Sequence, residues 1–390
     1  MSAGLTASGV AELHAVAQRF VGGDLIPGLV ALVARGEHVH VDALGTLAVD
    51  GPPVWRDSLF RISSTTKPIT AAATLALVAE GRLDLDEPVG RLLPELASPR
   101  VLRTMSGPLD DTVPARRPIT TRDLLTFTFG FGSGREQFLA PEPWPVVAAA
   151  DALGLATLGP PDPDRQPDPD TWIAGLGSLP LMAQPGERWL YSTGASVLGV
   201  LLARAASVPF AEVLRTRIFE PLGMHDTSFW ARDPSRLATA YRSGPDGLVV
   251  TDPPDGQWSA APAFCSGAGG LVSTVDDLLA FHRMLLAGGA GVLSPESVAL
   301  MITDHLTAEQ RAASTLFLEG QGWGFGGSVD ITAAGPGTIP GRYGWVGGSG
   351  TSAHIVRDRG SVAILLTQVG VDSPVPSTLM RDFWQHAAGF

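Results

Sequence analysis

Segments typical of β-strands lie near both ends of the 390-residue chain, and a long, mostly helical stretch separates them. Residues 29–34 and 39–43 flank Arg35-Gly36-Glu37 as in a hairpin, and residues 344–357 and 360–368 are joined by Asp358-Arg359-Gly360. Strands so far apart in sequence most simply pair in one antiparallel sheet. We therefore predict an α+β fold with a discontinuous sheet domain (1–80 and 265–390), an inserted mainly helical domain (81–264) and an active site in the cleft between them.

Apolar periodicity and capping residues predict the helices. We expect them over 11–21, over an Ala/Leu/Val-rich segment that ends near Gly81, and over 119–127, 195–206, 210–219, 275–286 and 376–388, with a turn and a further helix in 82–93. The proline-rich segment 160–170 (PPDPDRQPDPD) is predicted to be neither helix nor central strand. We expect an exposed loop there, at the rim of a cleft.

Composition narrows the possible partners and locations. With 27 basic and 39 acidic residues the net charge is −12, which disfavours binding to nucleic acid or to an anionic membrane. The single cysteine, Cys265, excludes an internal disulfide and a cysteine-based zinc site. The first residues lack the basic and apolar pattern of a secretory leader, so we expect a cytoplasmic protein. We expect its partner to be a small-molecule substrate. The oligomeric state is left open.

Lys67 is the only lysine, and the other 26 basic residues are arginines. Lysine, unlike arginine, can lose its proton when it is buried. Ser64 precedes it by three positions, which places both side chains on one face of a helix and lets the amine reach the hydroxyl. At a helix N-terminus, Lys67 could be a neutral base and the Ser64 N–H could stabilise an oxyanion. The alternative is that Ser64 caps the helix and Lys67 is solvated, and Pro68 requires the pair to lie in the first turn.

Two later segments carry further candidates. Tyr191 is one of three tyrosines and stands at a loop-to-helix junction, where a phenol can point into a cleft; the alternative is a boundary aromatic residue. Trp345-Val346-Gly347 lies in a glycine-rich segment, where a ligand can approach the backbone; the alternative is a bulge or a tight bend. Sequence patterns for a nucleophile elbow, a phosphate-binding loop or a zinc-binding helix are not found, and we expect no cofactor and no metal.

Together these motifs resemble the serine-reactive hydrolases of the class C β-lactamase type and, within them, the family VIII carboxylesterases. Ser64-Thr65-Thr66-Lys67 matches their Ser-x-x-Lys motif, Tyr191-Ser192-Thr193 is similar to Tyr-x-Asn, and Trp345-Val346-Gly347 stands at the place of Lys-Thr-Gly. The resemblance implies a β-lactamase/penicillin-binding-protein-like fold and an acyl-enzyme on Ser64, with Lys67 and Tyr191 sharing the proton network. It also implies an oxyanion hole from the N–H groups of Ser64 and Gly348.

The departures from the family pattern favour simple esters. Trp345 replaces the lysine that holds a β-lactam carboxylate, Thr193 replaces an asparagine, and Phe127 and Phe129 stand at the places of a histidine and a serine. We therefore predict a carboxylesterase for small neutral esters, with Trp345, Val346, Gly347 and Phe127 as substrate-binding residues. Alternatives are an amide or oligomer hydrolase of the nylon-degrading kind, a weak β-lactamase or D-peptidase, and an inactive penicillin-binding-like sensor.

Overall fold

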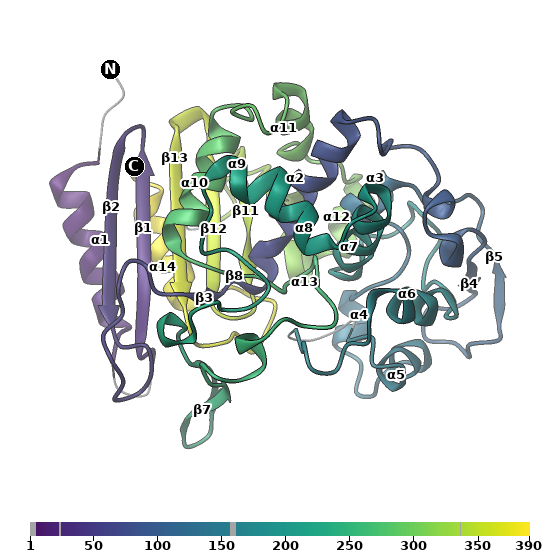
Figure 1. Ribbon diagram of the computed structural model, residues 1–390, viewed down its shortest axis with the longest axis horizontal. Coiled ribbons are helices and arrows are strands. Elements are labelled where there is room, and N and C mark those ends of the chain that lie inside the picture. Colours follow the sequence, from purple (N-terminus) through teal and green to yellow (C-terminus); the bar gives the residue numbers. More distant parts are fainter. Residues whose placement is uncertain (1–4, 23–24, 157–160, 336) are drawn as a thin grey trace.

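The computed structural model describes residues 5–22, 25–156, 161–335 and 337–390. A seven-stranded antiparallel sheet has the order β2-β1-β13-β12-β11-β10-β9 (Figure 1). Its strands are β1 (Gly28–Arg35), β2 (His38–Gly45), β9 (Gly322–Trp323), β10 (Ser328–Val329), β11 (Arg342–Gly347), β12 (Thr351–Val356) and β13 (Ser361–Thr367). Strand β1 lies between β2 and β13, so that Leu32 faces Val41 on one side and Ile364 on the other. Strands from the two ends of the chain therefore pair, and the predicted fold class is confirmed.

The helices cover both faces of the sheet and form the middle of the chain. They are α1 (Ala7–Arg19), α2 (Thr66–Ala79), α3 (Thr121–Leu125), α4 (Arg135–Phe138), α5 (Pro145–Ala152), α6 (Pro169–Gly177), α7 (Thr193–Ala206), α8 (Phe210–Leu214), α9 (Glu220–Leu222), α10 (Val275–Leu286), α11 (Pro295–Met301), α12 (Ala308–Ala313), α13 (Thr315–Leu318) and α14 (Thr378–Ala387). Short strand pairs join β3 (Phe60–Arg61) with β8 (Val272–Ser273), β4 (Arg100–Leu102) with β5 (Thr112–Pro114), and β6 (Ala240–Gly244) with β7 (Gly247–Asp252). The division into domains at 80/81 and 264/265 stays a prediction.

Successive side chains of β1 enter two different cores, as strand geometry requires. Val30 and Leu32 belong to the main core, with residues of α2 and α10. Leu29 and Ala31 belong to a second core, with residues of α1 and α14. Because both faces of β1 are buried, its sequence is an almost continuous apolar run instead of an alternating one.

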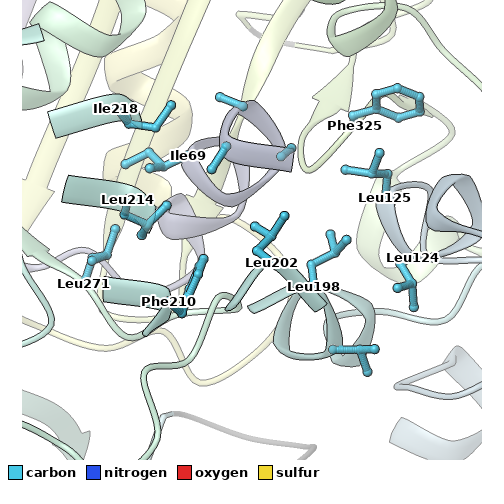
Figure 2. Packing of buried hydrophobic residues seen from close by; sticks show 14 of the residues in the cluster. Ile69, Leu124, Leu125, Leu198, Leu202, Phe210, Leu214, Ile218, Leu271 and Phe325 are labelled. Carbon is cyan, nitrogen blue, oxygen red and sulfur yellow. The ribbon is translucent and has the colours of Figure 1, made fainter. Parts of the chain in front are cut away.

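Helix α2 is the central helix of the main core, and 12 of its 14 residues are buried. Figure 2 shows Ile69 of α2 close to Leu214 of α8, with Leu198 and Leu202 of α7 nearby. A helix that is apolar on all sides must be enclosed by other elements. The enclosure has a consequence for function, because it takes Lys67, in the first turn of α2, out of solvent.

Three predicted elements were wrong in detail. The segment 344–357 is two strands, because Gly350 has a φ of 87° and turns the chain back between β11 and β12. The segment 82–93 contains no α-helix and only a 3₁₀ turn at Val89–Arg91, since Pro88 and the following Pro94 interrupt helical hydrogen bonding. The proline-rich segment ends earlier than expected, because Asp168 caps α6 and Pro169 is its first residue. Residue 160 lies outside the described residues.

In the part of the chain that the structure describes, no single helix has the length and apolar character needed to cross a membrane. One pair of helices, α7 with the segment Phe210–Leu222, passes that test jointly by length and composition, and the two are bent by 80° at the break between them. The predicted cytoplasmic location stays a prediction.

Candidate active site

Ser64 lies at the point where the chain passes from β3 into α2. The 3₁₀ turn Ser63–Thr65 leads directly into the helix, and Ser63 adopts a left-handed φ of 46°. A non-glycine residue in this region is strained, and such strain is common at functional sites. The turn is held from the sheet side, because the hydroxyl of Thr351 donates to the carbonyl of Ile62 over 3.0 Å. Ser64 is thereby fixed at the N-terminus of the buried central helix.

Lys67 lies one turn further along the same helix and points back toward Ser64. Its Nζ lies 2.7 Å from Ser64 Oγ and 2.6 Å from the carbonyl oxygen of Ala268. Only 1% of Lys67 is exposed, and this burial holds the pKa of its amine well below the ordinary value of 10.5. A neutral amine has two N–H donors and one lone pair. One N–H can therefore donate to Ala268 while the lone pair accepts the hydroxyl proton of Ser64.

Tyr191 approaches the same amine from another part of the chain. It precedes α7, and Ser192 makes the turn into that helix with a φ of 83°. The centre of the Tyr191 ring lies 4.7 Å from Lys67 Nζ, and its hydroxyl accepts a hydrogen bond of 2.6 Å from the indole N–H of Trp345. Burial raises the pKa of Tyr191 to about 12, although hydrogen bonding with Ser64 and Trp345 acts in the opposite direction. The phenol therefore keeps its proton at neutral pH.

Two backbone N–H groups border the serine. The end of β11 passes close to the turn before α2, since a Cβ on Gly347 would lie 2.5 Å from the carbonyl oxygen of Ile62. The next residue, Gly348, has more room, and a Cβ there would lie 3.7 Å from Ser63 Oγ. The N–H groups of Ser64 and Gly348 donate to no other described residue. Both are thus available to a ligand oxygen, as an oxyanion hole requires.

An aromatic cluster surrounds Tyr191. Its ring centre lies 5.6 Å from that of Trp345, 5.1 Å from that of Phe317 and 6.0 Å from that of Phe127. Trp323 closes the cluster, 4.8 Å from Trp345 in an edge-to-face arrangement. Such pairs add specific attraction to the apolar burial and hold the rings in place. The wall beside the nucleophile is therefore rigid and mostly apolar.

The predicted substrate-binding residues occupy different layers of this wall. Trp345 is in the cluster beside Tyr191, whereas Phe127 has no exposed surface and lies behind it, against Trp323. Val346 contacts both the aromatic cluster and the core on the α14 side. Phe129, the other phenylalanine of that segment, belongs to the main core.

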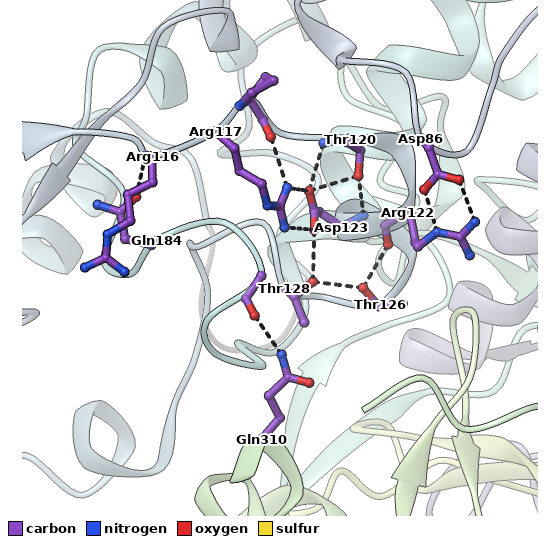
Figure 3. A network of polar contacts seen from close by, with 12 residues as sticks. Asp86, Arg116, Arg117, Thr120, Arg122, Asp123, Thr126, Thr128, Gln184 and Gln310 are labelled. Atoms are coloured by element: carbon purple, nitrogen blue, oxygen red, sulfur yellow. Dashed lines mark hydrogen bonds and ion pairs between the residues drawn. The ribbon is translucent and has the colours of Figure 1, made fainter. Parts of the chain in front are cut away.

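A polar network fixes the backbone that carries Phe127. Asp123 and Thr120 form a capping box at α3, and Arg117 makes two hydrogen bonds to the Asp123 carboxylate, of 2.6 and 2.8 Å (Figure 3). The hydroxyl of Thr128 also donates to Asp123, over 3.3 Å. These contacts hold Phe127, whose φ is 58°, between two anchored positions. The sequence pattern predicted the start of α3 but not that the contacts of Asp123 hold Phe127 in place.

Sequence reasoning missed two features of the site. The carbonyl of Ala268 and the ring of Phe317 come from distant segments, and neither has a local sequence signature. Thr193, which replaces the asparagine of the related motif, has a buried hydroxyl oxygen that lacks a hydrogen-bond partner among the described residues. The proline-rich segment also approaches the site, since a Cβ on Gly269 would lie 2.9 Å from the ring of Pro161 and 3.5 Å from the carbonyl carbon of Ser63.

An antiparallel sheet flanked by helices, with a serine and a lysine one turn apart at the start of the central helix, defines the β-lactamase and penicillin-binding-protein class of folds. The chain belongs to the Beta-lactamase family, because a sequence model of that family matches residues 13–382. The expected relationship is thereby confirmed.

Individual relatives refine this placement. The chain is 40% identical to Protein Rv1367c of Mycobacterium tuberculosis over 344 residues, which cover 84% of this chain and 82% of the relative. It is 34% identical to Esterase EstB of Burkholderia gladioli, with 96% and 94% covered. Among solved structures, EstCE1, described as a hydrolase with promiscuous acyltransferase activity, superposes with a TM-score of 0.81 at 26% identity and covers 98% of this chain and 99% of that one.

Proposed function

We propose that this protein is a serine carboxylesterase, which hydrolyses small neutral esters with short-chain or aromatic groups through an acyl-enzyme on Ser64. The observation that carries the proposal is the buried amine of Lys67, 2.7 Å from Ser64 Oγ, with its pKa lowered by burial. A serine hydroxyl needs a base before it can attack a carbonyl carbon. Since the pKa of Tyr191 is raised, Lys67 is the base of the first step.

The reaction follows from the positions of these groups. Ser64 Oγ attacks the ester carbonyl carbon as its proton passes to Lys67, and the N–H groups of Ser64 and Gly348 stabilise the oxyanion. The carbon–oxygen bond to the alcohol then breaks, and the leaving alcohol takes the proton of the Tyr191 hydroxyl. Lys67 then passes the proton that it received from Ser64 to Tyr191. Water then attacks the acyl carbonyl carbon and gives one proton to Lys67 and Tyr191. The bond between the acyl group and Ser64 Oγ breaks, the acid leaves, and this proton returns to Ser64, which regains its hydroxyl.

The substrate class follows from the side chain that stands where related lactamases have a lysine. Trp345 offers one neutral donor, and that donor already binds the Tyr191 hydroxyl. A β-lactam carboxylate would therefore lack a charge-assisted partner at this position. Val346 and Gly347 continue the same wall, and Phe127 supports it from behind. Neutral acyl and alcohol groups suit this surface better than anionic ones.

The comparisons support an ester bond as the target. Esterase EstB is named for that activity, and EstCE1 is described as a hydrolase. Both match almost the full length of this chain. Ester hydrolysis is therefore the activity with the strongest support, ahead of lactam or amide hydrolysis.

A fluorophosphonate labelling experiment tests the nucleophile. The expected result is one adduct, which peptide mass spectrometry places on Ser64 and which is absent from the Ser64→Ala variant. Ser63 is the matched control, because it is adjacent but its hydroxyl does not contact the amine of Lys67; Ser63→Ala should still be labelled at Ser64. Labelling of another serine, with esterase activity retained in Ser64→Ala, would overturn the proposal.

A further inference from the structure

The two N–H groups that border the serine hydroxyl belong to segments that are far apart in the sequence. Ser64 lies in the turn between β3 and α2, whereas Gly348 follows the end of β11 (Figure 1). An oxyanion hole works only when both donors lie within about 2.7–3.1 Å of the position of the developing oxyanion. The contacts that hold these two segments together therefore set the geometry of the hole.

Two hydroxyl groups connect the segments. Ser349 directly follows Gly348, and its hydroxyl donates to the carbonyl of Arg61. The hydroxyl of Thr351, the first residue of β12, donates to the carbonyl of Ile62 over 3.0 Å. Each link thus begins within three residues of one N–H donor of the oxyanion hole and ends within three residues of the other.

The links lie in a closely packed region. Thr351, Arg61 and Ile62 are buried, and Ser349 is half-buried. A Cβ on Gly347 would lie 2.2 Å from the hydroxyl oxygen of Thr351 and 2.5 Å from the carbonyl oxygen of Ile62, so only glycine lets the end of β11 approach this closely. Hydrogen bonds that are shielded from water are stronger than exposed ones, and these two can therefore hold a fixed spacing.

Both of the connected segments are anchored independently. The guanidinium of Arg61 is buried, pairs with Asp252 and donates to the carbonyl oxygen of Ala238 over 2.6 Å. On the other segment, the N–H of Val371 donates to the carbonyl of Gly348 over 2.9 Å. Loss of one hydroxyl should therefore change the separation of the two segments without unfolding either of them.

We propose that Ser349 and Thr351 are positioning residues, whose hydroxyl groups set the separation between the N–H groups of Ser64 and Gly348. Both hydroxyls bind backbone carbonyls, so they act through these two N–H groups. The inference rests on the proposed esterase reaction, which places the oxyanion between the same two groups. Loss of a link should weaken stabilisation of the tetrahedral intermediate more than binding of the ester, whose carbonyl oxygen carries less charge.

Two substitutions of Thr351 separate the hydroxyl from the shape of the side chain. Thr351→Val keeps the shape and removes the hydroxyl, whereas Thr351→Ser keeps the hydroxyl and removes a methyl group. Loss of a whole oxyanion donor costs about 10²–10³-fold in kcat, so displacement of one should cost less. We expect Thr351→Val to lower kcat for p-nitrophenyl butyrate about tenfold with KM within about twofold, and Thr351→Ser to retain most of the rate.

Ser349 provides a second pair at a half-buried position. Ser349→Ala should lower kcat as Thr351→Val does, and Ser349→Thr, which keeps the hydroxyl, should retain most of the rate. Acylation and deacylation both pass through an oxyanion, so kcat reports on the hole whichever step limits the rate. Fluorophosphonate titration counts the folded active sites, so that all rates are compared per site.

A transition-state analogue gives a readout that a purely structural role would not change. Butyl trifluoromethyl ketone accepts Ser64 Oγ at its carbonyl carbon and places the resulting oxyanion in the hole, whereas butyl methyl ketone adds a serine only weakly. In Thr351→Val and Ser349→Ala, Ki should rise about tenfold for the fluorinated ketone and by less than about twofold for the other.

Thr74→Val is the control for the loss of a buried hydroxyl. Thr74 has no exposed surface, and its hydroxyl donates to the carbonyl of Thr70 over 2.9 Å within α2. The change breaks no link between the two segments, so kcat and both Ki values should stay within about twofold of wild type.

The outcomes decide the proposal. Wild-type kcat per active site in Thr351→Val and Ser349→Ala would overturn it, and so would a raised KM at unchanged kcat. A fast Thr351→Val beside a slow Thr351→Ser would assign the effect to packing and would also overturn it. Retained activity in Ser64→Ala would overturn the esterase proposal and this inference with it. An inactive Ser64→Ala beside a fully active Thr351→Val and Ser349→Ala would overturn the positioning role alone.

Discussion

Replacing Lys67 by methionine separates the chemical role of the amine from its role in packing. The methionine side chain is flexible, unbranched and apolar, so it fills the space at the start of α2 without placing a polar group there. The change leaves Ser64 Oγ and the Ala268 carbonyl without the amine that lies 2.7 and 2.6 Å from them. If Lys67 is the base, kcat/KM for p-nitrophenyl butyrate should fall by about 10²–10⁴-fold, or about 2.7–5.5 kcal/mol in transition-state stabilisation.

The same variant reports on the charge of Lys67 through stability. Burial lowers the pKa of the amine in the folded protein, whereas in the unfolded chain the pKa returns to about 10.5. Between the two values the unfolded chain binds a proton that the folded protein does not. The unfolding free energy of the wild type should therefore rise with pH across this window and level off above the unfolded pKa, with a slope of at most about 1.4 kcal/mol per pH unit.

The methionine side chain binds no proton, so the unfolding free energy of Lys67→Met lacks this dependence on pH. The unfolding free energy of Lys67→Met minus that of the wild type should therefore be highest at about pH 6 and should fall toward about pH 9. Urea unfolding of both proteins at the two pH values measures the difference. Lys67→Arg is the control, because arginine stays charged and should lose both rate and stability. A stability difference that does not vary with pH, or a Lys67→Arg enzyme within threefold of the wild-type rate, would refute the neutral base.

Three further predictions concern the rest of the site. Tyr191→Phe should lose turnover while the free energy of unfolding falls by only about 0.5–1.5 kcal/mol. Tyr241→Phe also removes a buried hydroxyl and should keep the rate, and the opposite pattern would show that the third catalytic group is elsewhere. Parallel assays should give kcat/KM for p-nitrophenyl butyrate at least about 10²-fold above that for nitrocefin, about 2.7 kcal/mol, because the one donor of Trp345 is already used; an equal or faster nitrocefin rate would favour a lactamase. Gly347→Ala should destabilise the protein by roughly 1–3 kcal/mol in thermal unfolding, since its Cβ would lie 2.2 Å from the hydroxyl oxygen of Thr351. A Cβ on Gly348 has room, so Gly348→Ala should have a small effect, and equal effects of the two changes would contradict the packing described.

The features that the sequence predicted well depend on neighbours in the chain. Ser64 and Lys67 lie three residues apart, so helix geometry alone brings the amine to the hydroxyl. The hairpin of β1 and β2 follows from two apolar runs around a short turn, and the start of α3 follows from its capping residues. In each case the contact is local, and the preferences of a few residues decide it.

Apart from the pairing of strands from the two ends of the chain, the contacts between distant segments were decided by the tertiary structure. Tyr191, Trp345 and Ala268 reach Lys67 or one another only because α7, β11 and the loop before β8 pack around α2. The turn that divides residues 344–357 likewise depends on Gly350, where a Cβ would lie 2.1 Å from the hydroxyl of Thr367. No periodicity encodes such contacts, because they arise when remote apolar surfaces are buried together.

The sequence by itself therefore determined that one lysine stands within reach of one serine, and that strands from the two ends of the chain share a sheet. Whether that lysine can serve as a base was decided by the fold. An amine on an exposed helix would keep its ordinary pKa and its proton, whereas the Lys67 amine, enclosed with α2 in the core, loses its solvation and the pKa falls. Burial is a property of the whole packed molecule, and for that reason the chemistry of Lys67 could be read only from the tertiary structure.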